Sequence, residues 1–237
     1  MPFNDIKAIL FDKDGTLLHF EASWLPALKR AAMEAADHNP DLALKLLTDT
    51  GYDPDTQKVV TGSIIGAGNT QDIAAAWSNT GSSHKISQLV EILDRIFSSA
   101  MEDAVPVSGL TETIATLKAE NYVLGVASSD SVAAIEVFLK MAGVRDSFDF
   151  VVGYDSGHGH KPDPGMLLAF SSAIGIEPTY IAMIGDNPQD LQMAETAGAG
   201  GKFGVLTGNS YAHDLEPLAD AVLTDITSLP SILSSVD

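Results

Sequence analysis

The fold is decided by Ala8-Ile9-Leu10-Phe11-Asp12-Lys13-Asp14-Gly15-Thr16, a stretch in which a short apolar run ends in two carboxylates and a glycine. The apolar run has the length and composition of a β-strand covered on both faces, as the strands of parallel sheets are. In open α/β sheets, ligands bind outside the carboxyl ends of such strands. We therefore expect a catalytic site at Asp12 and Asp14, with Gly15 allowing the backbone to turn just beyond them.

The two carboxylates are close enough in sequence to repel each other. One of them would keep its proton unless a cation or a hydrogen-bond network held both ionised, and a divalent metal is the simplest such cation. With both ionised, one carboxylate can attack an electrophile while the other moves a proton, and aspartate is an established nucleophile toward phosphoryl groups. This interpretation requires partners elsewhere in the chain.

The composition is that of an ordinary globular protein. The 237 residues are 45% hydrophobic, which suffices for one large domain or two smaller ones. We find neither a run of about 18 apolar residues nor a signal-peptide layout, and so expect a soluble, cytoplasmic protein, monomeric or homodimeric, with no membrane partner. The chain has no cysteine, which excludes disulfides and thiolate metal sites.

The charge is strongly negative, with 13 basic and 32 acidic residues and a formal net charge of -19. Such a field repels nucleic acids, and we expect no nucleic-acid partner. It would also slow the approach of an anionic substrate. A phosphate site in this chain must therefore depend on a metal ion and a few local cations.

The pattern along the chain divides it into two kinds of sequence. Residues 20–50, with a break at Asn39-Pro40, and residues 70–101 have helical spacing of apolar residues, and a flexible stretch at 62–69 separates them. From Val107 onward, helical segments alternate with short apolar runs at residues 123–127, 150–152, 181–184, 204–206 and 221–223. This alternation predicts a parallel sheet with helices on both faces.

These patterns predict an α/β fold in which a Rossmann-like parallel sheet is interrupted by an all-helical insertion. We expect residues 1–17 and 104–237 to form the sheet domain and residues 18–103 to form the inserted helical domain.

Three further groups of polar residues follow predicted strands or turns. Ser128-Ser129-Asp130 follows the second strand and suits a phosphate oxygen, although Ser129 or Asp130 alone would serve as a helix cap. Lys161 lies in a proline-rich turn and is either a surface residue or a cation for a phosphate or for neighbouring carboxylates. The nearby His158-x-His160 pair can bind metals, but no thiolate accompanies it.

Asp186 and Asp190 follow the strand at 181–184. Asp186 would complete a set of oxygen ligands for Mg²⁺, whereas either residue alone would equally well cap a helix. Capping does not explain why acidic or hydroxyl groups recur after three strands.

Taken in order, Asp12-Lys13-Asp14-Gly15-Thr16, Ser128, Lys161 and Gly185-Asp186-x-x-x-Asp190 resemble the four motifs of the haloacid dehalogenase superfamily. The resemblance spans nearly the whole chain. It implies that the insertion at 18–103 is a helical C1 cap. It also implies Mg²⁺ as the cofactor and a small phosphorylated metabolite as the substrate.

The resemblance implies a role for each matching residue. Asp12 would attack phosphorus to form an aspartyl-phosphate, and Asp14 would protonate the leaving alcohol and then activate water. Mg²⁺ would be held by the Asp12 side chain, the Asp14 backbone carbonyl and the Asp186 carboxylate. The remaining roles are phosphoryl binding by Ser128 with its neighbour Ser129, charge stabilisation by Lys161, and orientation of these groups by Asp190.

The second acid, Asp14, favours phosphoryl transfer over dehalogenation, and Thr16 is typical of phosphatases in this superfamily. Val107-Ser108-Gly109-Leu110 and Ala194-Glu195-x-Ala197-Gly198 are similar to phosphoglycolate phosphatases. Specificity is expected to depend on the 62–69 stretch of the cap, with Gly66, Gly68 and Asn69 as substrate-binding residues.

The leading hypothesis is a magnesium-dependent phosphatase, with phosphoglycolate as the best single guess for the substrate. A phosphosugar mutase resembling beta-phosphoglucomutase is the second enzymatic hypothesis. A non-catalytic binding protein on the same fold is the third.

Overall fold

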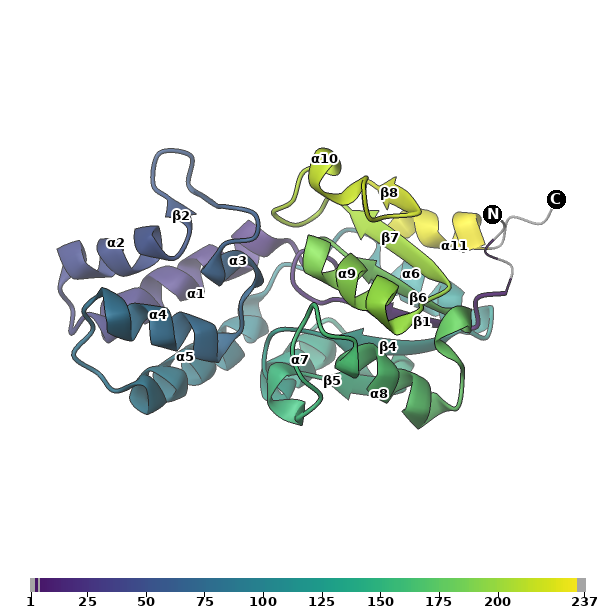
Figure 1. Ribbon diagram of the computed structural model, residues 1–237, viewed down its shortest axis with the longest axis horizontal. Helices are drawn as coiled ribbons and strands as arrows, with labels where there is room; N and C mark the ends of the chain where they lie inside the picture. The colour runs from purple at the N-terminus through teal and green to yellow at the C-terminus, as the bar shows by residue number, and fades with distance from the viewer. Residues whose placement is uncertain (1–2, 4, 234–237) are drawn as a thin grey trace.

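The computed structural model describes residue 3 and residues 5–233, and one half of it is built around a six-stranded parallel sheet (Figure 1). The strands lie in the order β5-β4-β1-β6-β7-β8, so the connection from β5 to β6 passes over both β4 and β1. The strands are β1 (Ala8–Phe11), β4 (Val123–Ala127), β5 (Phe150–Val152), β6 (Ile181–Gly185), β7 (Gly201–Val205) and β8 (Ala221–Leu223). The predicted α/β fold is confirmed. The remaining residues of the expected sheet domain, 1, 2, 4 and 234–237, lie outside the described part.

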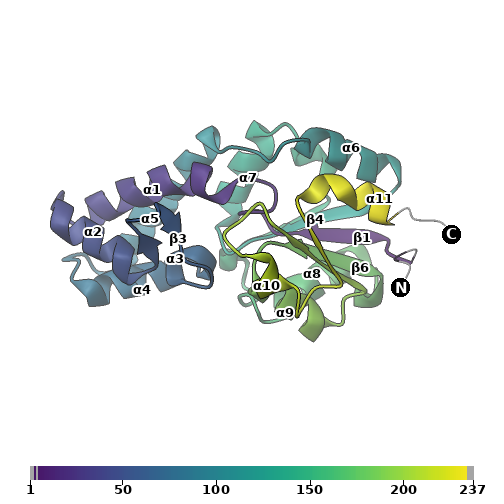
Figure 2. The ribbon, with the colours of Figure 1, turned by 90° about the horizontal axis from the view of Figure 1, so that it is seen from above.

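Helices cover both faces of the sheet (Figure 2). Alternate residues of β1 point to opposite faces: Ile9 and Phe11 pack into one apolar core, and Ala8 and Leu10 into the other. The first core includes residues of α6 (Leu110–Ala119), α7 (Val132–Met141) and α11 (Leu229–Leu233), and the second includes residues of α8 (Gly165–Ile174) and α9 (Pro188–Ala197). This burial on both faces explains the uninterrupted apolar sequence of β1.

The segment at 18–103 forms a separate group of helices beside the sheet (Figure 1). These are α1 (Phe20–Ala35), α2 (Pro40–Asp49), α3 (Ile64–Ala67), α4 (Thr70–Thr80) and α5 (Ile86–Ala100). The break expected at Asn39-Pro40 is present, because the Asn39 side chain accepts bonds from the backbone N–H groups of Asp41 and Leu42, and Pro40 begins α2.

The inserted segment differs in two details from the expectation. It is not helical throughout, because β2 (Tyr52–Asp53) and β3 (Lys58–Val59) pair as a short antiparallel ribbon. The Asp53 side chain accepts bonds from the Asp55 N–H and the Thr56 hydroxyl, which closes the turn between them. The stretch expected to be a flexible loop contains the single-turn helix α3. Two-residue strands and one-turn helices are too short to show periodicity in a sequence.

Strand β7 begins at Gly201, three residues before the predicted position. Glycine carries no side chain that could mark one face of a strand, so the pattern of alternation misses the first part of β7. Pairing with β6 and β8 on either side determines its true extent.

The two connections between the sheet and the inserted segment lie side by side. The Val107 N–H donates to the Leu17 carbonyl (3.0 Å), and the His19 N–H donates to the Val105 carbonyl (2.9 Å). The remaining short elements are α10 (Ala212–Leu215) and the 3-10 helices η1 (Met101–Asp103), η2 (Arg145–Ser147), η3 (Tyr154–Ser156), η4 (Pro178–Tyr180) and η5 (Ile226–Ser228).

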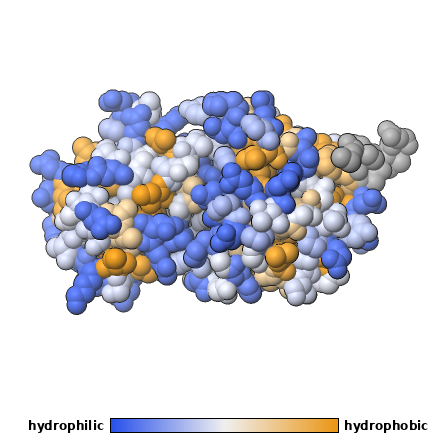
Figure 3. Space-filling view, viewed as in Figure 1, coloured by the Kyte–Doolittle hydropathy of each residue, from blue (hydrophilic) through white to orange (hydrophobic). Residues whose placement is uncertain are grey.

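The face seen in Figure 3 is mostly hydrophilic, with hydrophobic residues in small separate groups. Within residues 3 and 5–233, none of the helices has the length and apolar character needed to cross a membrane.

Candidate active site

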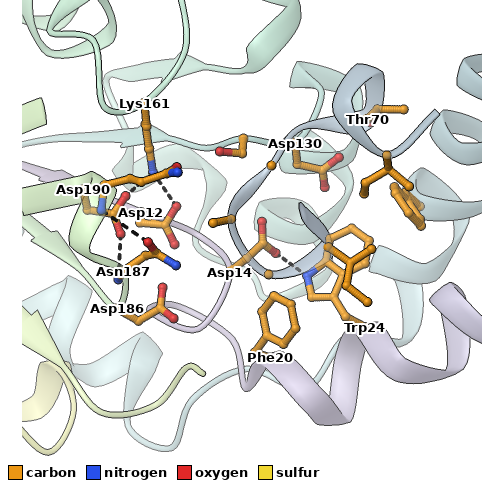
Figure 4. A pocket seen from close by; sticks show the side chains of 18 of the residues that line it. Asp12, Asp14, Phe20, Trp24, Thr70, Asp130, Lys161, Asp186, Asn187 and Asp190 are labelled. Atoms are coloured by element: carbon orange, nitrogen blue, oxygen red, sulfur yellow. Dashed lines mark hydrogen bonds and ion pairs between the residues drawn. The ribbon is translucent and has the colours of Figure 1, made fainter. Parts of the chain in front are cut away.

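The polar residues predicted from the strand ends meet at one edge of the sheet (Figure 4). Phe11, the last residue of β1, is in register with Val126 of β4 and Ile184 of β6, so the three strands end at nearly the same level. The residues that directly follow therefore converge. Asp12 is linked to β6 by a bond from its N–H to the Ile184 carbonyl (2.8 Å).

Lys161 lies between two buried carboxylates. Its Nζ is 2.6 Å from Asp12 Oδ1 and 2.6 Å from Asp190 Oδ1. Burial alone would lower the pKa of Lys161, but the charges of Asp12 and Asp190 outweigh it and raise the pKa above its ordinary value. Lys161 is therefore a permanent cation inside the site rather than a surface residue.

Asp190 completes the capping box of α9, whose N-cap residue is Asn187, and it is also a site residue. Its Oδ2 accepts a bond from the Asn187 N–H (3.0 Å) at the start of α9, while its Oδ1 faces Lys161. The two alternatives that the sequence leaves open for Asp190 are thus both realised, one by each oxygen.

Asp12, Asp186 and Asp190 form a buried cluster in which one oxygen from each lies within 4.8 Å of the others. Burial raises the pKa of Asp12 to about 7, against the attraction of Lys161 and with added repulsion from Asp190. Burial, Asp12 and Asp190 likewise raise the pKa of Asp186 well above its ordinary value. Without a further cation, Asp12 and Asp186 therefore bind protons more tightly than ordinary aspartates do.

The cluster fits a divalent cation that prefers oxygen ligands. Asp12 Oδ2 is buried and has no hydrogen-bond partner. Asp186 lies closely packed against Gly15, where a Cβ would approach its Oδ2 to 2.6 Å, and accepts a bond from the Asn209 N–H (3.2 Å). One oxygen from each of the three carboxylates lies within 4.8 Å of the others, and Asp186 is fixed in position, which is the arrangement that a divalent cation with oxygen ligands requires. A metal would also remove the repulsion that raises both pKa values.

The carboxylate of Asp14 lies apart from this cluster. Its Oδ1 accepts a bond from the indole Nε1 of Trp24 (2.6 Å), and its Oδ2 accepts one from the hydroxyl of Ser128 (3.1 Å). Trp24 belongs to α1, in the inserted segment, so a group of that segment orients a carboxylate of the sheet edge (Figure 4). The sequence offered no indication of this contact.

Lys13 and Asp130 form a second ion pair that sequence reasoning missed. Lys13 is fully buried, with its Nζ 2.7 Å from Asp130 Oδ2, 2.9 Å from Asp14 Oδ1 and 3.2 Å from the sulfur of Met101. Burial opposes its charge, but Asp130 and Asp14 outweigh burial and raise the pKa of Lys13. A lysine directly after an apolar strand was the only signal available, and it does not identify the partner.

The serines after β4 have different positions from those expected of helix caps. Ser131, not Ser129 or Asp130, caps α7, because its hydroxyl accepts the Ala134 N–H. Ser128 is fully buried and accepts a bond from the Asp130 N–H while donating to Asp14. Ser129 lines a cavity between the sheet edge and the inserted segment.

A small cavity of ≈70 Å³ lies between the sheet edge and the inserted segment. On the sheet side it is lined by Asp12, Lys161 and Asp186, together with Asn187, whose buried amide Nδ2 has no partner. Sequence reasoning did not identify Asn187. Its position between Asp186 and a proline-started helix is that of an ordinary cap, and only the tertiary structure shows its amide at the cavity (Figure 4).

Of the three residues expected to bind substrate from the inserted segment, two reach the cavity. Gly66 and Gly68 line it, and a Cβ on Gly66 would approach Asn209 Nδ2 to 2.6 Å and the backbone carbonyl oxygen of Val60 to 2.9 Å, which disfavours a larger residue there. Asn69 does not line the cavity, because its side chain caps α4. His158 and His160 are exposed and also lie outside the cavity lining.

Comparison with known proteins places this site in a family. Residues 6–198 match the family model described as haloacid dehalogenase-like hydrolase. The chain is 36% identical to "Probable phosphatase IndB" of Dickeya dadantii over 51% of this chain and only 52% of that protein. It is 27% identical to phosphoglycolate phosphatase of Rhodospirillum rubrum over 94% of this chain and 89% of that enzyme.

Solved structures agree on the fold. CbbY from Rhodobacter sphaeroides, solved in complex with phosphate, superposes with a TM-score of 0.70 at 21% identity, covering 94% of this chain and 96% of that one. The match over residues 6–198, on a fold whose acidic strand ends meet at one cavity, shows that the chain belongs to the haloacid dehalogenase-like hydrolase family.

Proposed function

We propose that the protein is a magnesium-dependent phosphatase that hydrolyses a small phosphorylated metabolite through an aspartyl-phosphate on Asp12. One observation carries the proposal. Asp12 lines the cavity with one oxygen fixed by Lys161 and the other, Oδ2, buried and without a partner. A carboxylate that is fixed on one side and free on the other is oriented for nucleophilic attack. The phosphatases named among the relatives support the same reaction class.

In the first step, Asp12 Oδ2 forms a bond to phosphorus while the bond from phosphorus to the ester oxygen breaks. Asp14 gives a proton to that oxygen, and the alcohol leaves. In the second step, Asp14 takes a proton from water as the water attacks phosphorus, which releases phosphate and restores Asp12. Trp24 and Ser128 hold the Asp14 carboxylate in one orientation for both transfers.

Few protein groups are placed to stabilise the negative charge of the transferring phosphoryl group. Lys161 supplies a fixed positive charge, held in place by Asp190, and the free amide of Asn187 supplies a donor. Asp12, Asp186 and the backbone carbonyl of Asp14 would hold Mg²⁺. When bound, the ion would neutralise negative charge on the phosphoryl oxygens.

Residues 18–103 would act as a C1 cap over this site, with residues 1–17 and 104–237 as the catalytic domain. The close contact of Gly66 with Asn209 and the apolar residues above the cavity support this division. Closure by the cap would exclude bulk water from the aspartyl-phosphate.

The test is Asp12→Asn, assayed on a broad panel of phosphate esters with Mg²⁺ and with chelator. Removal of the nucleophile is expected to lower kcat by about 10³-fold or more, while the protein remains folded. Chelator should abolish wild-type turnover. A folded Asp12→Asn protein with near wild-type activity would exclude Asp12 as the nucleophile.

The mutase hypothesis is less well supported by the cavity. A phosphosugar mutase must enclose a sugar that carries phosphate, whereas this cavity holds ≈70 Å³, well below the roughly 300–1,000 Å³ of sites for larger ligands. Product analysis separates the two reactions, since a mutase yields an isomer and little free phosphate. A binding protein without turnover would fail on the whole panel.

Phosphoglycolate is the substrate suggested by the resemblance and by the name of the Rhodospirillum rubrum relative. The lining of the cavity favours a leaving group of different chemistry.

A further inference from the structure

The side of the cavity that would face the leaving group is apolar. Four helices of the inserted segment, α1, α3, α4 and α5, contribute buried hydrophobic side chains, which are Phe20, Trp24, Leu28, Ile65, Ile73 and Phe97. The rings of Trp24 and Phe97 pack edge to face, with 4.7 Å between their centroids, which holds these two side chains in place. A hydrophobic surface of this kind gains nothing from contact with a charged group.

Several polar groups that the inserted segment brings to this side already have partners. The Trp24 indole donates to Asp14. The N–H groups of Gly66 and Gly68 donate to the carbonyls of Ser63 and Ile64 within and before α3. The Thr70 hydroxyl interacts with the phenol of Tyr154. These groups are therefore not available to bind a second anionic group of the substrate.

The charge around the cavity is also unfavourable to a second anion. Of the described residues that line it, Lys161 is the only cation, and it is already placed between Asp12 and Asp190. Five carboxylates line the same space, those of Asp12, Asp14, Asp130, Asp186 and Asp190. Lys13 does not line the cavity. It is fully buried and paired with Asp14 and Asp130, so it is not available to bind the substrate.

We infer that the substrate is the phosphate monoester of a small, uncharged alcohol with a mainly apolar carbon skeleton, and not an ester whose leaving group carries a carboxylate. This inference rests on the proposed phosphatase function. A leaving carboxylate such as that of glycolate would be buried against hydrophobic side chains with no partner, next to a surplus of negative charge. The size of the cavity, ≈70 Å³, restricts the alcohol to a few carbon atoms.

The test compares two esters of the same shape, isobutyl phosphate and 2-phosphoglycolate, in which two methyl groups replace the two carboxylate oxygens. With Mg²⁺ present, kcat/KM for isobutyl phosphate is expected to exceed that for 2-phosphoglycolate by about 100-fold. Equal values, or a preference for 2-phosphoglycolate, would overturn the inference. 4-Nitrophenyl phosphate serves as a reporter of the reaction itself. If none of the three esters is hydrolysed, the proposed function fails, and the inference fails with it.

A pair of variants tests whether charge is the cause. Ala67 is half-buried at the end of α3 and lines the cavity, so a longer side chain can extend from it. Ala67→Lys adds a cation there, and Ala67→Met adds a chain of similar length without charge. Relative to Ala67→Met, Ala67→Lys should raise kcat/KM for 2-phosphoglycolate by about tenfold and leave that for isobutyl phosphate unchanged. The absence of any such gain would contradict the inference.

Discussion

At the scale of single residues, the carboxylate of Asp12 links catalysis to stability. Burial raises its pKa to about 7 from the usual 3.8, so the metal-free folded protein binds a proton that the unfolded chain has already released. Between pH 3.8 and about pH 7, the folded state binds more protons than the unfolded state, so the unfolding free energy falls as pH rises. Each unit of pKa difference corresponds to about 1.4 kcal/mol of unfolding free energy.

We therefore expect wild-type protein in chelator to lose unfolding free energy between pH 4 and pH 7, relative to Asp12→Asn, which has no charge to acquire. Addition of Mg²⁺ at pH 7.5 should remove most of this difference, because the ion stabilises the ionised carboxylates. Urea unfolding of both proteins across this pH range measures it. If the unfolding free energies of the two proteins change in parallel with pH in chelator, the titration of Asp12 does not affect stability.

At the scale of elements, helix α1 connects the inserted segment to the end of strand β1. Trp24, in the second turn of α1, donates its indole N–H to Asp14 at 2.6 Å and packs against Phe97 of α5. The position of the helix thereby determines the orientation of the proposed acid/base. Trp24 acts through Asp14 and is a positioning residue.

Trp24→Phe keeps an aromatic ring against Phe97 but removes the donor. We expect kcat to fall by about tenfold, which corresponds to the loss of roughly one hydrogen bond to a charged group, with little change in the unfolding temperature. In an Asp14→Asn background the same substitution should cause no further loss, because the two residues act as one unit. Additive losses in the double variant would indicate that Trp24 acts on the substrate and not on Asp14.

At the scale of the whole molecule, two hydrogen bonds connect the inserted segment to the sheet domain through residues that do not themselves line the cavity. The Thr61 hydroxyl donates to the Asn209 carbonyl, and the Tyr154 hydroxyl donates to Asp94 Oδ2 at 2.9 Å. Residue 61 and residue 94 belong to the inserted segment, and their partners belong to the sheet domain. These bonds favour the arrangement in which the cavity is covered.

The double variant Thr61→Val/Tyr154→Phe should weaken this arrangement by roughly 1–3 kcal/mol, since each bond contributes about 0.5–1.5 kcal/mol. We expect a larger radius of gyration in small-angle X-ray scattering and a higher KM. Thr48→Val/Tyr180→Phe is the matched control, because these residues lie away from the contact between the two parts. If both double variants scatter like the wild type, the two bonds do not hold the inserted segment in place against the sheet domain.

Much of the fold was predictable because the strands are short apolar runs with polar ends. The runs at 123–127 and 150–152 became β4 and β5 without change, since both have strand-like composition and are bounded by turns. Strand β7 was placed three residues late because Gly201 carries no side chain. The ribbon of β2 and β3 was missed because two-residue strands show no period.

The sequence by itself determined which residues follow the strand ends, and hence that Asp12 and Asp186 would meet, because parallel strands in register present their carboxyl ends at one edge. Ser128 follows its strand at the same edge but bonds to Asp14 and does not line the cavity. Only the tertiary structure decided the partners of Lys13 and Trp24. Lys13 pairs with Asp130, 117 residues away, and the Trp24 contact depends on how an entire helix lies over the sheet. Local sequence specifies each strand and where it ends. The apolar side of the cavity instead arises from packing between helices α1, α3, α4 and α5, whose contacts cannot be read from any local sequence pattern.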